Sequence, residues 1–181
     1  MRGRPKEKNM TREDKLFKRI RAGDHQALDE LIEMYYPEIL RFCAWHTIGK
    51  ENAEDAAQET FLKTVKYMDK YVQRGMFKTF LYKVALNVCI DLSRKKKDEP
   101  DEEEIEGRIY IDNALENTES DIDFGNLIAF LPDKQRELVI LRYSQDLTLR
   151  EISKITGMNL RSVQSSLRSA LKKLEERWKR Q

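Results

Sequence analysis

Basic and hydrogen-bonding side chains recur at helical spacing in one stretch near the end of the chain. They are Arg161, Ser162, Gln164, Ser165, Arg168 and Lys172. Cationic groups neutralise phosphates, and an amide such as that of Gln164 can read the edge of an adenine. The pattern therefore predicts recognition of duplex DNA. The competing interpretation is a small helical bundle whose basic face is only solvated.

Two short helices around a tight turn must position this set. Thr148 and Glu151 have the spacing of a capping box, which starts a helix. Gly157 can end that helix, and Asn159 can cap the next one. The inner side of the second helix is expected to bury Leu160, Val163, Leu167, Leu171, Leu174 and Trp178. This succession predicts a helix-turn-helix, whose second helix fits the major groove.

A second cluster lies on an amphipathic helix expected from Asn52, its cap, to Met68. Ala57, Phe61, Leu62 and Val65 form its apolar side. Asp55, Gln58 and Glu59 gather in its first half, and Lys63 and Lys66 follow in its second half. A helix dipole favours this order of charges, so a merely solvated face is the alternative to a binding surface.

A third group combines aromatic rings with cations between Tyr67 and Asn87. A long helix is expected from Phe77 to Lys97, with Lys78, Tyr82, Lys83 and Asn87 exposed on it. Rings that stack on bases, next to cations that neutralise phosphates, suit single-stranded nucleic acid. Tyr67 and Tyr71 would join this site, whereas Phe77 and Phe80 are expected in the core.

Composition and charge indicate the fold class and the kind of partner. The 181 residues are 36% charged and 40% hydrophobic, with only 7 Gly and 4 Pro, which predicts an all-α fold. The net charge of +2 hides a partition: about +7 for residues 1–97, −11 for 98–123 and +6 for 124–181. Basic blocks suit a polyanion, and the acidic block between them would be repelled by DNA.

The chain is expected to form two small helical domains. We predict a disordered basic tail (1–10), a first helical domain (11–97), a flexible acidic linker (98–121) and a second, four-helix domain (122–181). Asp24 should cap a helix in the first domain that Pro37 kinks or divides. Pro132 suits the first turn of a helix that runs to Tyr143.

Several functional classes are excluded by what the chain lacks. Cys43 and Cys89 each sit in an apolar helical pattern, so reduced core thiols are expected rather than a disulfide or a metal site. No nucleophile–base pair or glycine-rich phosphate loop occurs, so no enzyme activity and no cofactor are expected. Without a signal peptide or a 20-residue apolar run, the protein is expected to be cytoplasmic and not inserted in a membrane.

The order of these motifs resembles that of bacterial RNA polymerase sigma factors of the extracytoplasmic-function group. The resemblance runs from about Leu16 to Trp178. It rests on AEDAAQETFL (53–62), FKTFLYKVALNVCID (77–91), LPDKQRE (131–137) and the helix-turn-helix that follows. The resemblance implies a region-2-type helical bundle and a region-4-type domain, joined by the acidic linker.

The resemblance also implies partners and residue roles. Asp55, Gln58, Glu59 and Phe61 would bind the clamp coiled coil of core RNA polymerase, and the second domain would bind the flap. The −10 promoter element would be read and opened by Lys63, Lys66, Tyr67, Tyr71, Lys78, Tyr82, Lys83 and Asn87. The helix from Leu160 would read the −35 element through the six residues named first. An anti-sigma factor, in many such systems membrane-bound, would be a further partner.

Two places depart from the family pattern. Phe80 stands where the family often has Trp, and an aromatic ring is retained there. Gln164-Ser165-Ser166 stands where the family commonly has Lys-Ser-Arg, so fewer phosphate contacts are expected there.

Two other functions fit parts of the sequence. The first is a stand-alone regulator that binds a palindrome as a dimer. The second is a nucleoid-type protein that binds DNA by charge, against which the acidic linker argues.

Overall fold

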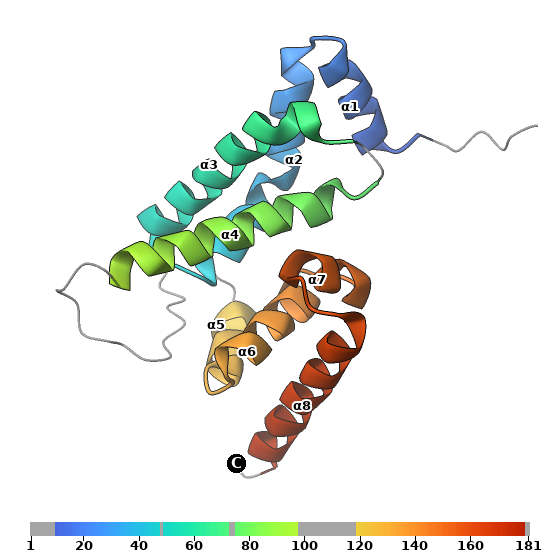
Figure 1. Cartoon of the computed structure of the whole chain (residues 1–181). Helices are drawn as coiled ribbons and strands as arrows, with labels where there is room; N and C mark the ends of the chain where they lie inside the picture. The colour runs from blue at the N-terminus through green and yellow to red at the C-terminus, as the bar shows by residue number, and fades with distance from the viewer. Residues whose placement is uncertain (1–9, 48, 73–74, 98–118, 180–181) are drawn as a thin grey trace, which may run out of the picture.

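The computed structural model describes residues 10–47, 49–72, 75–97 and 119–179, and all regular structure in these ranges is helical (Figure 1). The all-α prediction is therefore confirmed. The predicted tail lies outside the described residues except for Met10, as does the linker up to residue 118.

The first domain contains four α-helices. They are α1 (Arg12–Arg21), α2 (His25–Ala44), α3 (Lys50–Tyr67) and α4 (Phe77–Lys97), with a short 3₁₀ helix, η1 (Met68–Lys70), after α3. Helices α3 and α4 lie side by side and run in opposite directions (Figure 1). Their antiparallel packing brings residues near the middle of α3 opposite the second half of α4.

Local signals explain where most of these helices begin. Asp24 caps α2 by accepting a hydrogen bond from the backbone N–H of Ala27 at 3.3 Å, as predicted. Helix α3, however, begins at Lys50, because Gly49 adopts a positive φ of 81° that turns the chain there. The expected cap at Asn52 is therefore wrong, since Asn52 lies inside the first turn. Pro37 lies inside α2 without dividing it.

Aromatic rings form a large part of the first core. Phe77 packs edge-on against Phe17 and Tyr35, with ring centroids 5.0 and 5.4 Å apart. Tyr71 packs edge-on against Phe77 and stacks on Phe80 at 5.1 Å. Such pairs stabilise a core beyond their buried area. The prediction that Phe77 and Phe80 are core residues is confirmed, since Phe77 is buried and Phe80 is half-buried.

The second domain consists of α5 (Glu119–Ile128), α6 (Asp133–Val139), a π turn η2 (Ile140–Ser144), α7 (Leu149–Thr156) and α8 (Leu160–Trp178). Helix α5 starts at Glu119, within the stretch assigned to the linker. Pro132 precedes α6 as its cap residue rather than lying in its first turn. The helix predicted to reach Tyr143 ends in the π turn, closed by a 3.1 Å bond from Gln145 N–H to the Ile140 carbonyl.

The two domains touch each other. Helix α7 packs against α4, and α6 with its π turn lies below the ends of α2 and α4 in Figure 1. Among the described residues no helix is both long enough and apolar enough to cross a membrane.

Candidate functional site

The helix-turn-helix has the geometry that its sequence predicts. Thr148 Oγ1 accepts from the N–H of Glu151 at 3.3 Å, and the Glu151 carboxylate accepts from the N–H of Thr148 at 2.8 Å. Gly157 ends α7 in the left-handed conformation, with φ of 74°. Asn159 Oδ1 then accepts from the N–H of Ser162 at 2.8 Å and starts α8. These caps orient α7 and α8 relative to each other.

The buried side of α8 is narrower than predicted. Val163, Leu167 and Ala170 are buried, with Leu174 partly buried beside them. The remaining apolar positions, which were expected in the core, are exposed: Leu160, Leu171 and Trp178. The helix extends past the small domain beneath it, so its last turn with Trp178 has no core to face.

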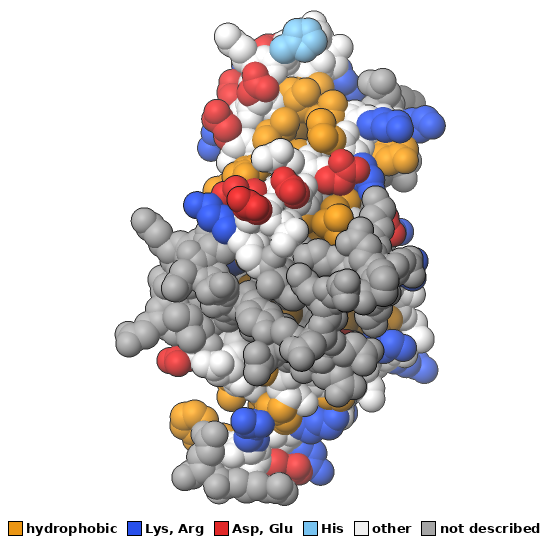
Figure 2. Space-filling view, turned by 90° about the vertical axis from the view of Figure 1, so that its left-hand side faces the viewer, with side chains coloured by type: hydrophobic (Ala, Val, Ile, Leu, Met, Phe, Trp, Pro, Cys, Tyr) orange, Lys and Arg blue, Asp and Glu red, His pale blue; other side chains and the backbone are white. Residues whose placement is uncertain are grey.

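The polar side of α8 faces solvent. Arg161, Gln164, Ser165, Arg168 and Lys172 are exposed, whereas Ser162 is half-buried at the cap. Lys172 makes one loose ion pair with Glu176, at 3.9 Å, and such exposed pairs contribute little energy. On the face drawn in Figure 2, Lys and Arg side chains predominate at the lower end, where the second domain lies. The predicted duplex-reading set is therefore accessible as a group.

A groove between α3 and α4 holds the acidic cluster. Asp55, Gln58 and Glu59 are exposed and line a cavity of about 660 Å³. Leu62, Val88 and Leu92 supply apolar lining, and Leu62 has 66% of its surface exposed. The groove thus places apolar surface directly beside carboxylates. In Figure 2, acidic side chains gather over the first domain.

Phe61 does not belong to this surface. It was expected to contact a partner, but its ring is buried and stacks on Tyr36 with centroids 5.9 Å apart. The buried side of α3 also includes Thr60 and Thr64, so it is rotated relative to the predicted one. Leu62 and Val65, which were expected to be buried, are exposed as a result.

Lys63 lies in the same groove as the acidic cluster. Its ammonium is 3.6 Å from Glu59 and 3.8 Å from Asp91 on α4. Lys63 nevertheless shares one face of α3 with Lys66 and Tyr67 of the predicted −10 set, which follow it three and four residues later. Asp91, which belongs to none of the predicted sites, completes the groove, because antiparallel packing brings α4 to this side of α3.

Four residues of the predicted −10 set remain open to solvent: Lys66, Tyr67, Lys83 and Asn87. Lys83 and Asn87 are four residues apart on α4 and share one face of it. Lys78, by contrast, pairs with Glu38 of α2 at 2.9 Å. Tyr71 is half-buried, with one ring face stacked on Phe80. The set is therefore divided between an open surface and the domain interior.

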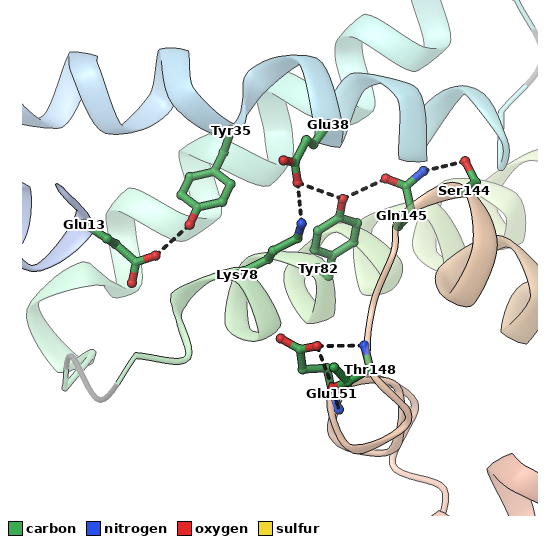
Figure 3. A network of polar contacts seen from close by, with 9 residues as sticks. All are labelled: Glu13, Tyr35, Glu38, Lys78, Tyr82, Ser144, Gln145, Thr148 and Glu151. Carbon is green, nitrogen blue, oxygen red and sulfur yellow. Dashed lines mark hydrogen bonds and ion pairs between the residues drawn. The ribbon is translucent and has the colours of Figure 1, made fainter. Parts of the chain in front are cut away.

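Tyr82 was expected to be exposed, and this is wrong. Its side chain is buried, and its hydroxyl donates to the Gln145 side-chain oxygen of the second domain at 2.7 Å (Figure 3). Burial, together with the nearby Glu38 carboxylate, raises the pKa of Tyr82 well above its ordinary value, so the hydroxyl stays a neutral donor. Phe42 of α2 packs edge-on against the Tyr82 ring at 5.3 Å, so contacts from distant segments, which periodicity cannot detect, bury this side chain.

The two cysteines have the state that the sequence predicts. Cys43 and Cys89 are both free and buried. No group of three or more potential metal ligands occurs among the described residues.

Comparison with known proteins shows which class of protein has this architecture. Residues 31–99 match the family model of Sigma-70 region 2, and residues 122–174 match that of Sigma-70, region 4. Two helical domains of these types, the second with a helix-turn-helix, define a sigma factor.

Relatives narrow the class further. The chain is 31% identical over 178 residues to the ECF RNA polymerase sigma factor SigW of Bacillus subtilis, covering 88% of this chain and 94% of SigW. It is 31% identical over 158 residues to SigM of the same organism, covering 83% and 96% of the two chains. The chain belongs to the extracytoplasmic-function sigma factors, and its function is promoter-specific initiation of transcription by RNA polymerase.

Solved structures share the fold. The structure of CnrH in complex with the cytosolic domain of CnrY aligns with a TM-score of 0.67 at 16% identity, covering 91% of this chain and 95% of CnrH. The sigma factor RpoE of Bartonella quintana, solved with the anti-sigma factor NepR, aligns at 0.64 and 21% identity, covering 83% and 96%.

Proposed function

We propose that the groove between α3 and α4 is the surface through which this sigma factor binds core RNA polymerase. Asp55, Gln58 and Glu59 present negative charge on one side of it, and Leu62 presents exposed apolar surface. A basic coiled coil, such as the one at the polymerase clamp, has the complementary charge and shape. Leu62 replaces Phe61 in this assignment, because Phe61 is buried.

The second part of the proposal concerns DNA. Helix α8 reads the −35 element through its exposed polar side, in which Arg168 and Lys172 neutralise phosphates and Gln164 reaches base edges. Lys66, Tyr67, Lys83 and Asn87 contact the −10 element, with Tyr67 as the exposed stacking ring. The observation that carries this assignment is the accessible polar face of α8, held by the capped turn at Gly157.

Partners and setting complete the proposal. The protein acts as a non-catalytic specificity subunit in the bacterial cytoplasm, where its polymerase and promoters are. The polymerase flap contacts the second domain. CnrH was solved in complex with the cytosolic domain of CnrY, and RpoE in complex with the anti-sigma factor NepR, which supports an anti-sigma partner for this protein too.

In vitro transcription tests the proposed function directly. The full-length protein is added to core RNA polymerase and genomic promoter fragments, and defined transcripts are expected only when both proteins are present. Binding to core is measured in parallel. A protein that neither binds core nor directs initiation contradicts the proposal.

A further inference from the structure

A chain of polar contacts joins the two domains. Tyr82 of α4 donates to Gln145, whose amide nitrogen donates to Ser144 Oγ at 2.9 Å. Ser144 Oγ also accepts from the indole nitrogen of Trp45, at the end of α2, at 3.0 Å. In Figure 3 Tyr82, Gln145 and Ser144 follow one another along this chain, with Glu38 and Lys78 at its other end. Both domains thus contribute donors and acceptors to one network.

Two further contacts lie on either side of this chain. His46 Nε2 is 2.5 Å from a Glu137 carboxylate oxygen, and the Trp45 ring packs edge-on against Phe124 at 5.3 Å. At the other end of α4, Lys154 of α7 reaches the Met76 sulfur at 2.8 Å. The contacts therefore extend from the start of α4 to the end of α2.

The interface also contains open space. A cavity of about 780 Å³ lies between the domains beside the polar chain, lined by Trp45, His46, Cys89 and Glu137 among others. Interfaces between domains of one chain resemble transient protein–protein interfaces, and relative motion of the domains is expected unless the interface is large and hydrophobic. The geometry is that of a reversible contact.

The closed arrangement cannot read both promoter elements at once. Elements at −10 and −35 lie about 25 base pairs apart, which is about 85 Å along B-form DNA. The lengths of α7, the turn and the polar side of α8 add up to about 40 Å, so α8 reaches at most that far from the contact between α7 and α4. Even when the whole length of α4, about 32 Å, is added, the surfaces that read the −10 and −35 elements are closer together than the about 85 Å between the two elements.

The chain between the domains is long enough for them to separate. Residues 98–118 can span up to about 70 Å when fully extended. Opening would also uncover Tyr82, which the second domain covers in the closed form.

We propose that the contact of the π turn and α6 with α2 and α4 is an autoinhibitory latch that keeps the free protein closed. The inference rests on the proposed function, because it assumes that α4 and α8 read separate promoter elements. Polymerase and promoter bind the open form. The free energy needed to break the Tyr82–Gln145, Trp45–Ser144 and His46–Glu137 contacts therefore reduces their net binding free energy.

Trp45 provides a reporter for the latch. The chain has two tryptophans, and Trp178 is exposed while Trp45 is buried at the interface. In a Trp178→Phe background, emission therefore comes from Trp45 alone. Adding Glu137→Gln and Gln145→Ala is expected to red-shift this emission and to increase its quenching by acrylamide. The same variant is expected to bind promoter DNA without polymerase about tenfold more tightly than its parent, because the competent form is more populated.

A matched control uses another glutamine. Gln135 makes its hydrogen bonds within the second domain, to Ser169 and Lys173, so Gln135→Ala removes a comparable side chain without touching the interface. It is expected to leave emission and DNA affinity unchanged. Helix content measured by circular dichroism shows that each variant is folded. The proposal is overturned if the Trp45 emission of the latch variant is unchanged. It is also overturned if the emission shows that the variant is open but its affinity for DNA is unaltered.

Different measurements test the latch and the proposed function. Transcription by the unmodified protein with core polymerase tests the function and does not depend on the latch. Acrylamide quenching of Trp45 tests closure in the absence of DNA and polymerase. A protein that transcribes but whose Trp45 is already solvent-accessible keeps the function and rules out the latch.

Discussion

His46 of α2 and Glu137 of α6 form an ion pair between the domains in which both imidazole nitrogens are donors. Nε2 faces the Glu137 carboxylate at 2.5 Å, and Nδ1 faces the carbonyl oxygen of Phe42 at 2.7 Å. A carbonyl oxygen and an ionised carboxylate only accept, so the imidazolium is the form of the ring that satisfies both partners. Burial alone lowers the pKa of His46, but the charge and hydrogen bond of Glu137 outweigh it and raise the pKa to about 8.

Closure should therefore weaken as the pH rises. The pKa is raised from 6.5 to about 8, so the ion pair contributes fully below pH 6.5 and its contribution disappears as the pH passes through about 8. The size of the shift corresponds to about 2 kcal/mol. Trp45 emission in the Trp178→Phe background, titrated from pH 6 to 9, is expected to move toward the open value.

Two variants identify the titrating group. His46→Gln is expected to abolish the pH dependence between pH 6.5 and 8. Cys43 is the control, since its pKa is lowered by a hydrogen bond with Cys89 and it lies near His46. Cys43→Ala is expected to retain the dependence. If the titration persists in His46→Gln, another group is responsible.

Charge reversal on α3 should weaken polymerase binding. Asp55→Lys with Glu59→Lys places two cations in the groove, and the affinity for core polymerase is expected to fall at least tenfold, because repulsion replaces attraction. Fluorescence anisotropy with labelled protein measures it. Asp29→Lys with Glu33→Lys is the matched control, because these residues are an exposed acidic pair at the same spacing on α2. Equal affinities for the two double variants would move the docking surface away from α3.

Removing two cations from α8 should weaken −35 recognition. Arg168→Ala with Lys172→Ala is expected to reduce transcription from −35-dependent promoters. The slope of log affinity for DNA against log salt should fall by about two, one for each phosphate that is no longer neutralised. Lys15→Ala with Lys18→Ala, on the exposed side of α1, removes the same charge elsewhere and should leave the slope as it is. Unaltered promoter use by the α8 variant rejects the assignment.

Gly157 should be the least replaceable residue of the turn. Its φ of 74° lies in the left-handed region, and a Cβ added there would meet no atom within 4 Å. The cost of Gly157→Ala is therefore conformational, about 1–2 kcal/mol of unfolding free energy. Gly157→Asn is expected to cost less, because Asn tolerates this conformation. Urea denaturation followed by circular dichroism measures both, and equal stabilities of Ala and Gly at this position would contradict the argument.

Features set by neighbouring residues were predictable from the sequence. The Thr148–Glu151 capping box, the Gly157 turn and the Asn159 cap each depend on residues within three positions of one another, and all three are observed. The all-α fold was predictable for the same reason. The DNA- and polymerase-binding roles of individual residues remain predictions.

Contacts between distant segments were not predictable in this way. Tyr82 was expected on the exposed side of α4, but Phe42 of α2 packs against its ring, and Gln145, 63 positions away, accepts a hydrogen bond from its hydroxyl. Phe61 and Leu62 are adjacent and both apolar, so periodicity could not decide which of them faces inward once buried Thr60 and Thr64 entered the same side of α3. The exposure of Trp178 depends on how far α8 extends beyond its domain, which is a property of tertiary packing.

The π turn at Ile140–Ser144 makes the contact between the domains a matter of chain length as well as of residue identity. A π turn holds one more residue than the α-helical turn it replaces, and each residue advances an α-helix by about 100°. A relative one residue shorter between Leu138 and Leu147 would carry its glutamine about a quarter of a turn away from the tyrosine, even with both residues retained. Alignments that count identities would score such a relative as having the pair, although its two domains would meet without it.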